Sequence, residues 1–343
     1  MRNSPRAFSL LADATCRKLG YKQCIAEPSL WYKEKGADGS TPEFLIRHVD
    51  DFVLVSSREN NDITQSKILC EFNNEGTYDS HPTSYLGMQL DISEGRIKIH
   101  QKAQIEKVIL KYNISTTEEP TCPYQPTIKV DDVADREGID MSILDDYRSL
   151  HASLAYVCQN TRPDCRFIHK ELSRYLTRPN RKLYSMLTRL AQYLYHTRDD
   201  GLVFDRKELL SILDEHSLVA MSDASLGDVR FQNNKKTRKS SFGYLIKYKG
   251  CTIVAKSSTI TDVVWSTTEA EYLAGSEAAR KIKHIKNILD FLNIKVSKPI
   301  LKMDNQASIH ISNDQTSLNR TKHLNMRYHF IRRAVEQRKL KVE

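Results

Sequence analysis

One segment organises this 343-residue chain: Trp265-Ser266-Thr267-Thr268-Glu269-Ala270-Glu271-Tyr272-Leu273-Ala274. It opens a long run in which apolar residues recur every three or four positions, and this spacing predicts a helix over 268–292. The apolar positions on the shared face are Ala274, Ala278, Ile282, Ile285, Leu289 and Leu292. Extended backwards, the face reaches Glu271 and passes by Glu269 and Glu277. A carboxylate on a core-facing side is costly unless it is paired, and a metal ion is a natural partner.

Two further acids end short apolar runs. Asp223 ends the run 217–223 and Asp304 ends the run 299–304, so both are expected at the carboxyl ends of buried strands. Ligands bind at that edge of an α/β sheet, and we expect Asp223, Glu271 and Asp304 to meet there. Three carboxylates repel one another unless cations lie between them, and Mg²⁺ with its oxygen ligands suits two-metal hydrolysis of a phosphodiester. Taken singly, each Asp could be a turn or cap residue and Glu271 a capping-box acid, but the three in chain order favour a metal site.

Five motifs follow one another in the last third of the chain. They are Ser222-Asp223-Ala224-Ser225, Lys239-Ser240-Ser241-Phe242-Gly243-Tyr244, Ser266-Thr267-Thr268-Glu269-Ala270-Glu271-Tyr272, Asp304-Asn305-Gln306-Ala307, and Arg320-Thr321-Lys322-His323 with Arg327-Tyr328-His329-Phe330-Ile331-Arg332. In this order they resemble the ribonuclease H domain of copia-type retrotransposon polyproteins. The resemblance implies that Asp223, Glu271 and Asp304 hold the metal ions, Mg²⁺ or Mn²⁺, that cleave the RNA strand of an RNA–DNA hybrid.

Charge and cysteine content narrow the class of protein. The net charge of +9 favours a polyanionic partner such as nucleic acid, although a mildly basic protein without such a partner has the same balance. None of the seven Cys residues forms a CxxC pair, so we expect reduced thiols in an intracellular protein. No apolar run is long enough to span a bilayer, and the N-terminus is too short and polar for a signal peptide.

Basic residues flank the predicted metal site in two groups. Each could neutralise a phosphate, and each could equally be a solvated charge that keeps the protein in solution. The first group is expected in a loop after Asp223, and the second borders the final helix. The candidates for nucleic-acid binding are Arg230, Lys235, Lys236, Arg238, Lys239, Arg320, Lys322, His323 and Arg327.

The N-terminal region carries a second pair of acids. The pattern of 48–55 predicts a β-hairpin with Asp50 and Asp51 at its turn, which is either a plain turn or a metal site. Four motifs, in order, resemble the palm of copia-type reverse transcriptases. They are Ser4-Pro5-Arg6-Ala7-Phe8, Leu19-Gly20-Tyr21, Pro28-Ser29-Leu30-Trp31-Tyr32 and Tyr85-Leu86-Gly87-Met88-Gln89-Leu90. The resemblance implies a remnant polymerase site at Asp50 and Asp51. His48 replaces the usual Tyr, and the family's third metal-binding Asp would precede residue 1, so we expect no polymerase activity from this chain.

The middle of the chain is expected to be structural. The pattern predicts a strand at 95–100 and a helix at 104–112, and the resemblance implies that they form a thumb-like element that grips the duplex. Three Pro residues mark 113–140 as a loop or linker. Three amphipathic helices follow, and 203–215 tethers them to the last domain. Arginines in this helical region were candidates for contacts with phosphates: Arg162, Arg166, Arg174, Arg178 and Arg181.

The expected fold class is therefore α/β, of mixed α+β type. It combines a partial reverse-transcriptase palm and thumb, a helical connection, and a ribonuclease H-like mixed sheet with flanking helices. The expected domains are 1–112 (palm and thumb), 113–140 (linker), 141–215 (connection) and 216–343 (ribonuclease H-like). The family's fourth acid would follow the strand that begins at Leu340, so a three-carboxylate site is expected here.

The expected function is that of a truncated retrotransposon reverse transcriptase/ribonuclease H. It would hydrolyse the RNA strand of RNA–DNA hybrids with a divalent metal; the alternative is a non-catalytic nucleic-acid-binding relic of the polyprotein. The expected partners are RNA–DNA hybrid, DNA and RNA, together with the remaining Pol segments or a second Pol copy, and no membrane. The expected location is the cytoplasm, the nucleus or both, or virus-like particles.

Overall fold

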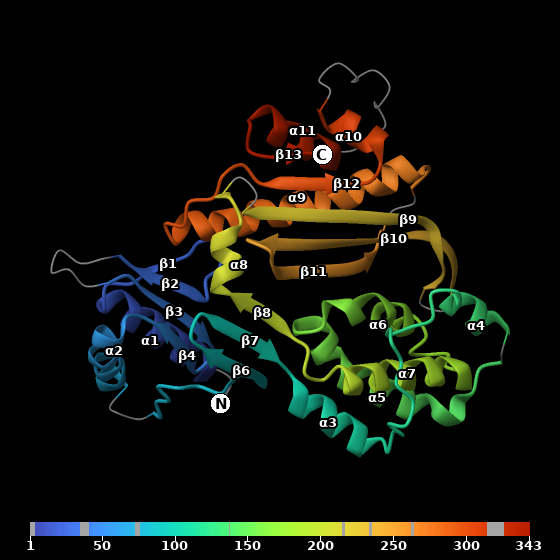
Figure 1. Cartoon of the computed structure of the whole chain (residues 1–343), viewed down its shortest axis with the longest axis horizontal. Coiled ribbons are helices and arrows are strands. Elements are labelled where there is room, and N and C mark those ends of the chain that lie inside the picture. The colour runs from blue at the N-terminus through green and yellow to red at the C-terminus, as the bar shows by residue number, and fades with distance from the viewer. Residues whose placement is uncertain are drawn as a thin grey trace. The chain divides into compact units, whose positions relative to one another are not determined.

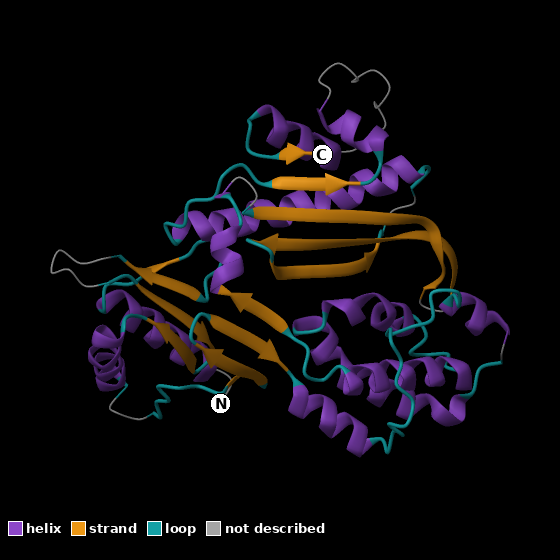
Figure 2. Cartoon of the chain, in the orientation of Figure 1, coloured by secondary structure: helices purple, strands orange, loops and turns teal. Residues whose placement is uncertain are grey.

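The computed structural model describes residues 4–34, 41–72, 76–136, 138–214, 217–232, 235–261, 264–313 and 326–343. The chain divides into two compact units. The first comprises 1–81 together with 283–296, and the second comprises 82–282 together with 297–343. Figures 1 and 2 show that both units combine helices and sheets, which confirms the expected mixed α/β class.

The first unit is a small antiparallel sheet with helices. The sheet has the order β1-β2-β3-β4, and Trp31 and Leu45 are buried against it. The hairpin of β3 and β4 pairs His48 with Asp51, as expected from the apolar–acidic–apolar pattern. The helix α2 was not expected, because its residues show little apolar periodicity. The elements are α1 (Ser4–Lys18), β1 (Lys22–Gln23), β2 (Leu30–Lys33), β3 (Glu43–His48), β4 (Asp51–Val55) and α2 (Arg58–Glu71).

The second unit begins with an antiparallel sheet of the order β5-β6-β7-β8. Its last strand, β8 (Leu202–Asp205), comes from the segment that we expected to be a tether. It pairs with β7 (Arg96–His100), far away in the sequence, with Leu202 opposite Ile99. This sheet therefore joins the thumb-like segment to the segment that follows the helical region. The remaining elements are β5 (Ser84–Tyr85), β6 (Met88–Ser93) and α8 (Arg206–Ser211).

A helical bundle follows in the same unit and holds its own core. Leu150, Leu154, Leu172 and Leu187 are fully buried there, on the faces that the sequence periodicity predicted. The segment expected as a linker contributes a short helix, α4, whose Val130 packs in the same core. The elements are α3 (Lys102–Lys111), α4 (Val130–Arg136), α5 (Leu144–Asn160), α6 (Arg166–Ser173) and α7 (Arg181–His196), with 3₁₀ turns at Met141–Ile143 and Pro163–Cys165.

The last part of the second unit is a five-stranded mixed sheet of the order β11-β10-β9-β12-β13. The strands β9, β10 and β11 are antiparallel, whereas β12 and β13 run parallel to β9. Both β9 and β10 extend far beyond the strands we expected, and Figure 1 shows them bending together. The elements are β9 (Leu218–Gln232), β10 (Lys235–Tyr248), β11 (Cys251–Thr259), α9 (Thr267–Phe291), β12 (Ile300–Met303), α10 (Gln306–Asn313), α11 (Met326–Glu336) and β13 (Lys341–Val342). The last part of α9, from residue 283, belongs to the first unit.

Candidate metal centre

Two of the three candidate acids come from neighbouring parallel strands. The strand β12 pairs in parallel with β9, and Met303 lies opposite Ser222 in this register. The next residue of each strand is an acid, so Asp304 and Asp223 stand at the same level of the sheet. Parallel pairing thus brings two carboxylates from positions 81 residues apart in the sequence to one edge.

The third acid comes from the second turn of α9. Ala270, Tyr272 and Ala274 are fully buried on either side of Glu271, so this part of the helix packs closely against the sheet. Gly275 makes the approach possible, because a Cβ there would lie 2.9 Å from Sδ of Met303 in β12. The hydroxyl of Ser308 in α10 also donates a hydrogen bond of 3.0 Å to the carbonyl of Thr268. These contacts hold Glu271 beside Asp223, which lies within β9, and beside the end of β12.

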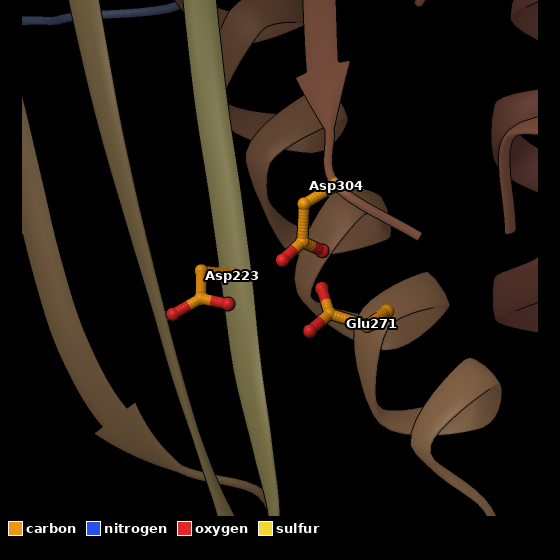
Figure 3. Close-up of side chains that lie close together, drawn as sticks. All are labelled: Asp223, Glu271 and Asp304. Atoms are coloured by element: carbon orange, nitrogen blue, oxygen red, sulfur yellow. The ribbon is translucent and has the colours of Figure 1, made fainter. Parts of the chain in front are cut away.

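The three carboxyl groups meet. One oxygen each from Asp223, Glu271 and Asp304 can be chosen so that all lie within 4.8 Å of one another. Figure 3 shows the groups gathered from β9, from α9 and from the end of β12. Glu271 is only 5% exposed, whereas both aspartates are exposed. The site is therefore closed on the side of Glu271 and open to solvent on the side of the aspartates.

A main-chain amide fixes one oxygen of Glu271. The N–H of Ala224 donates a hydrogen bond of 3.0 Å to Oε1. The other oxygen, Oε2, is buried and has no hydrogen-bond partner among the described residues. An unpartnered buried carboxylate oxygen is costly, and a cation is the partner that would remove the cost. Our sequence analysis did not identify the Ala224 amide, because no side-chain pattern indicates it.

The electrostatics of the cluster also favour a cation. Burial raises the pKa of Glu271 to about 7, because the hydrogen bond from Ala224 does not offset burial together with the charges of Asp304 and Asp223. Burial, and then the charge of Asp304, raise the pKa of Asp223. The donor set consists of hard carboxylate oxygens with one oxygen unpartnered, which fits Mg²⁺ or Mn²⁺. All three residues could act as ligands.

The second pair of acids lies elsewhere, in the first unit. Asp50 is in the β3–β4 turn and Asp51 begins β4, and both are exposed. The preceding Val49 has a φ of 57°, an unusual conformation for a β-branched residue in a tight turn. Among the described residues, Asp50 and Asp51 are not part of any group of three or more potential metal ligands.

The basic candidates differ from expectation in their surroundings. Arg230 belongs to β9 and Lys235, Lys236, Arg238 and Lys239 belong to β10, so the expectation of a loop after Asp223 was wrong. The two strands stay paired through this polar stretch, with irregularities in register between Lys236 and Ser241. Arg327 lies in α11, but its side chain is outside the described part of the chain, as are Arg320, Lys322 and His323 entirely.

Two arginines of the helical bundle are structural and do not face solvent. Arg162 is 2% exposed and forms an ion pair of 2.7 Å with Asp164. The guanidinium of Arg174 is buried and pairs with Asp131 at 3.0 Å. The expectation that these residues contact phosphates was wrong, since a guanidinium held in a buried ion pair is not available to a phosphate.

No protein-family model matches the chain. The whole chain is 26% identical over 356 residues to the "Retrovirus-related Pol polyprotein from transposon TNT 1-94" of Nicotiana tabacum, of which it covers 25%. It is 24% identical over 345 residues to the corresponding polyprotein from transposon RE1 of Arabidopsis thaliana, of which it covers 22%. With the "Transposon Ty1-LR3 Gag-Pol polyprotein" of Saccharomyces cerevisiae, it shares 28% identity over 257 residues, 71% of the chain and 13% of the polyprotein.

These relatives confirm the resemblance to copia-type Pol polyproteins that the motifs indicated. The chain spans a quarter or less of the length of these curated relatives. Among solved structures, a prototype foamy virus protease-reverse transcriptase matches 85% of the chain and 40% of its own with 10% identity and a TM-score of 0.27, a likeness too low to support an argument. Within the described residues, no helix combines the length and apolar composition of a membrane span.

Proposed function

We propose that this chain, which is related along its length to copia-type Pol polyproteins, carries a divalent-metal-dependent nuclease site that hydrolyses the RNA strand of RNA–DNA hybrids. The observation that carries the proposal is the convergence of Asp223, Glu271 and Asp304 within 4.8 Å. Carboxylates that crowd one another in this way are stable as anions only with cations between them. Phosphodiester hydrolysis is the reaction class that uses such a site.

Each acid contributes to the site in a different way. When bound, Mg²⁺ or Mn²⁺ would stabilise charge on the phosphodiester and lower the pKa of a water nucleophile. Glu271 is held from behind by the Ala224 amide, so its Oε2 is pre-positioned as a ligand. Because the pKa of Glu271 is raised to about 7, its carboxyl group must lose a proton before it can bind the metal ion. The carboxylates of Asp223 and Asp304 are exposed, so they can contact both the metal ion and an incoming substrate.

The substrate class rests on relationship and on charge. The related proteins are Pol polyproteins, and the net charge of +9 suits a nucleic acid. A 2′-hydroxyl is the feature that distinguishes RNA from DNA, so we propose that it selects the strand to be cut. Arg238 and Lys239 in β10 are proposed contacts with the phosphates, as are Arg230, Lys235, Lys236, Arg320, Lys322, His323 and Arg327.

We propose that Asp50 and Asp51 are a remnant of a polymerase site, and that other Pol segments or a second Pol copy are partners in the cytoplasm, the nucleus or virus-like particles. The specific ion, Mg²⁺ or Mn²⁺, is likewise proposed from the oxygen donor set.

Cleavage of a labelled RNA–DNA hybrid tests the proposed function. The protein should cut the RNA strand with Mg²⁺ or Mn²⁺ and not with EDTA. The variants Asp223→Asn, Glu271→Gln and Asp304→Asn should each lose roughly a hundredfold or more in rate, as the loss of several kcal/mol of charge stabilisation predicts. The control Glu277→Gln alters a partly buried acid of the same helix, outside the acid cluster and paired with Arg280, and it should cut normally. Equal cleavage by all four variants would refute the assignment, and metal-independent hybrid binding without cleavage would favour a non-catalytic binding protein.

A further inference from the structure

A cleft in the second unit opens beside the acid cluster. It has a volume of about 1050 Å³ and lies between the helical bundle and the sheet of β9, β10 and β11. Phe167 and Arg166 of α6 line one wall, and Gly243 and Lys247 of β10 line the other. Asp223 also lines this cleft, so the space is continuous with the candidate metal centre.

The helix α6 and Asp223 share one face of the sheet. Cross-strand pairs place Asp223 opposite Gly243 and Ser225 opposite Ser241, and side chains of such pairs point to the same side. Lys170 of α6 donates a hydrogen bond of 2.8 Å to the hydroxyl of Ser241. The cleft floor next to Asp223 carries no side chain, because the residue opposite is Gly243. A ligand at Asp223 can therefore continue along the floor towards α6.

Three of the five acids that line the cleft are paired with bases; of the other two, Asp223 belongs to the candidate metal centre and Asp228 accepts a hydrogen bond of 2.7 Å from the main-chain N–H of Ser241. Asp131 pairs with Arg174 at 3.0 Å, and Asp164 pairs with Arg162 at 2.7 Å. Glu171 pairs with Lys170 at 2.7 Å.

The cations of the cleft are differently placed. Within the described part of the chain, none of the four basic residues that line the cleft forms an ion pair with an acid; these residues are Lys129, Arg166, Lys247 and Lys256. The guanidinium of Arg166 instead donates to main-chain carbonyls, among them that of Ala255. Away from Asp223 and Asp228, the wall charge is therefore positive and suited to an anionic chain.

One wall of the cleft also presents aromatic rings. The rings of Tyr124 and Phe167 lie 5.5 Å apart, centroid to centroid, and Phe167 is 40% exposed. Bases of a single strand stack on an exposed aromatic ring, while nearby cations that have no ion pair hold the phosphate backbone electrostatically.

We propose that this cleft binds unpaired nucleotides of a single strand, next to the acid cluster. The inference rests on the proposed function for the identity of the ligand as nucleic acid. The volume of about 1050 Å³ is that of a pocket for a compact ligand, so a few nucleotides fit. The cleft thus adds a binding site for a single strand beside the metal centre, which is proposed to act on an RNA–DNA hybrid.

The test is the binding of labelled oligonucleotides in EDTA, so that no cleavage occurs. The probes are a blunt RNA–DNA hybrid, the same hybrid with a short 5′ or 3′ single-stranded extension, and a short single strand alone. At least one extension should tighten binding about tenfold over the blunt hybrid, as expected for base–aromatic stacking. Phe167→Leu should abolish that gain, and Phe167→Tyr, which keeps the ring, should retain it.

The salt dependence supplies an independent readout. Lys247→Ala should lower the slope of log affinity against log salt for the single strand by about 0.7, the value for one phosphate contact. Lys107→Ala in α3 changes an exposed lysine that does not line the cleft, and it should leave the slope unchanged.

The outcomes separate this inference from the proposed nuclease. If no extension tightens binding, or if Phe167→Leu keeps the gain, the single-strand site is refuted even where the hybrid is cut. If hybrids are never cut but the short single strand still binds in a manner that depends on Phe167, the single-strand site stands and the nuclease assignment fails.

Discussion

The main-chain N–H of Ala224 donates a hydrogen bond of 3.0 Å to Oε1 of Glu271, and this bond ties the first long strand of the mixed sheet to its long helix. The bond orients the carboxylate but satisfies only one of its oxygens. The metal-free fold therefore keeps Glu271 buried beside Asp223 and Asp304. Both the protonation of Glu271 and its binding of a metal ion can be measured.

Replacing Glu271 with Gln should stabilise the metal-free protein. In EDTA at pH 8 the wild-type carboxylate is ionised above its raised pKa of about 7, and it is buried beside Asp223 and Asp304. Gln keeps an acceptor for the Ala224 amide and removes the charge. We expect a gain of roughly 2 kcal/mol, measured by urea unfolding. The control Glu277→Gln should change stability by less than about 0.5 kcal/mol, and a destabilised Glu271→Gln would contradict the account.

The pH should control metal binding with a definite sign. Since the folded pKa of Glu271 is raised from 4.5 to about 7, its effect on the metal-free protein is to lose stability as pH rises through this range. Metal requires the ionised form, so the rise in melting temperature caused by Mg²⁺ should be larger at pH 8 than at pH 6. Thermal unfolding with and without Mg²⁺ measures this difference. An equal rise at both pH values would show that Glu271 is not a ligand.

A buried pair of histidines should make the helical bundle acid-labile. The rings of His151 and His169 stack at 3.9 Å, and the Nε2–H of each donates a hydrogen bond of 3.0 Å to the main-chain carbonyl of the other. Burial lowers the pKa of both, that of His151 to about 4. Because both are neutral in the fold, stability is complete above about pH 6.5 and falls as pH drops towards 4.

Hydrogen exchange in α5 and α6 at pH 7.5 and pH 5 measures this loss, after correction for the intrinsic rates. We expect His151 to account for roughly 2 kcal/mol of it. His151→Gln removes the titrating group, so the variant should lose less stability between the two pH values than the wild type. An identical loss in wild type and variant would exclude His151 as the cause.

The buried ion pairs of Arg174 should be structural. Its side chain is 4% exposed, contacts Asp131 at 3.0 Å and also pairs with Glu171. Arg174→Ala leaves buried acids without their cation and should cost about 3–5 kcal/mol in urea unfolding. Arg181→Ala removes an arginine that is 78% exposed and pairs with Asp140, and it should cost less than about 1 kcal/mol. Similar losses in both variants would contradict the structural role of Arg174.

The parts of the fold that sequence analysis predicted are those with a strong local period. The apolar steps of α9 placed Glu271 on the packed face, and the short apolar runs before Asp223 and Asp304 became neighbouring strands. Asp304 follows the end of β12 as predicted, but the prediction that Asp223 ends its strand was wrong, because β9 continues to Gln232. The two acids meet because the parallel register sets Met303 opposite Ser222.

The parts that were missed depend on tertiary contacts. The extension of β9 and β10 runs through polar residues, and only their mutual pairing makes them strands. The helix α4 lies in a stretch dominated by Pro and Asp, and it is held by contacts such as that of Asp131 with Arg174. The cleft beside α6 is made by segments far apart in the chain, so no local pattern indicates it.

The most direct test of the central claim is a measurement of Mn²⁺ binding to the protein at pH 8. Binding is measured as the loss of the free-ion signal in electron paramagnetic resonance. Wild type and Glu277→Gln should bind the ion, and Glu271→Gln and the double variant Asp223→Asn/Asp304→Asn should bind it far more weakly. Equal binding by all four proteins would show that Asp223, Glu271 and Asp304 do not form a metal centre.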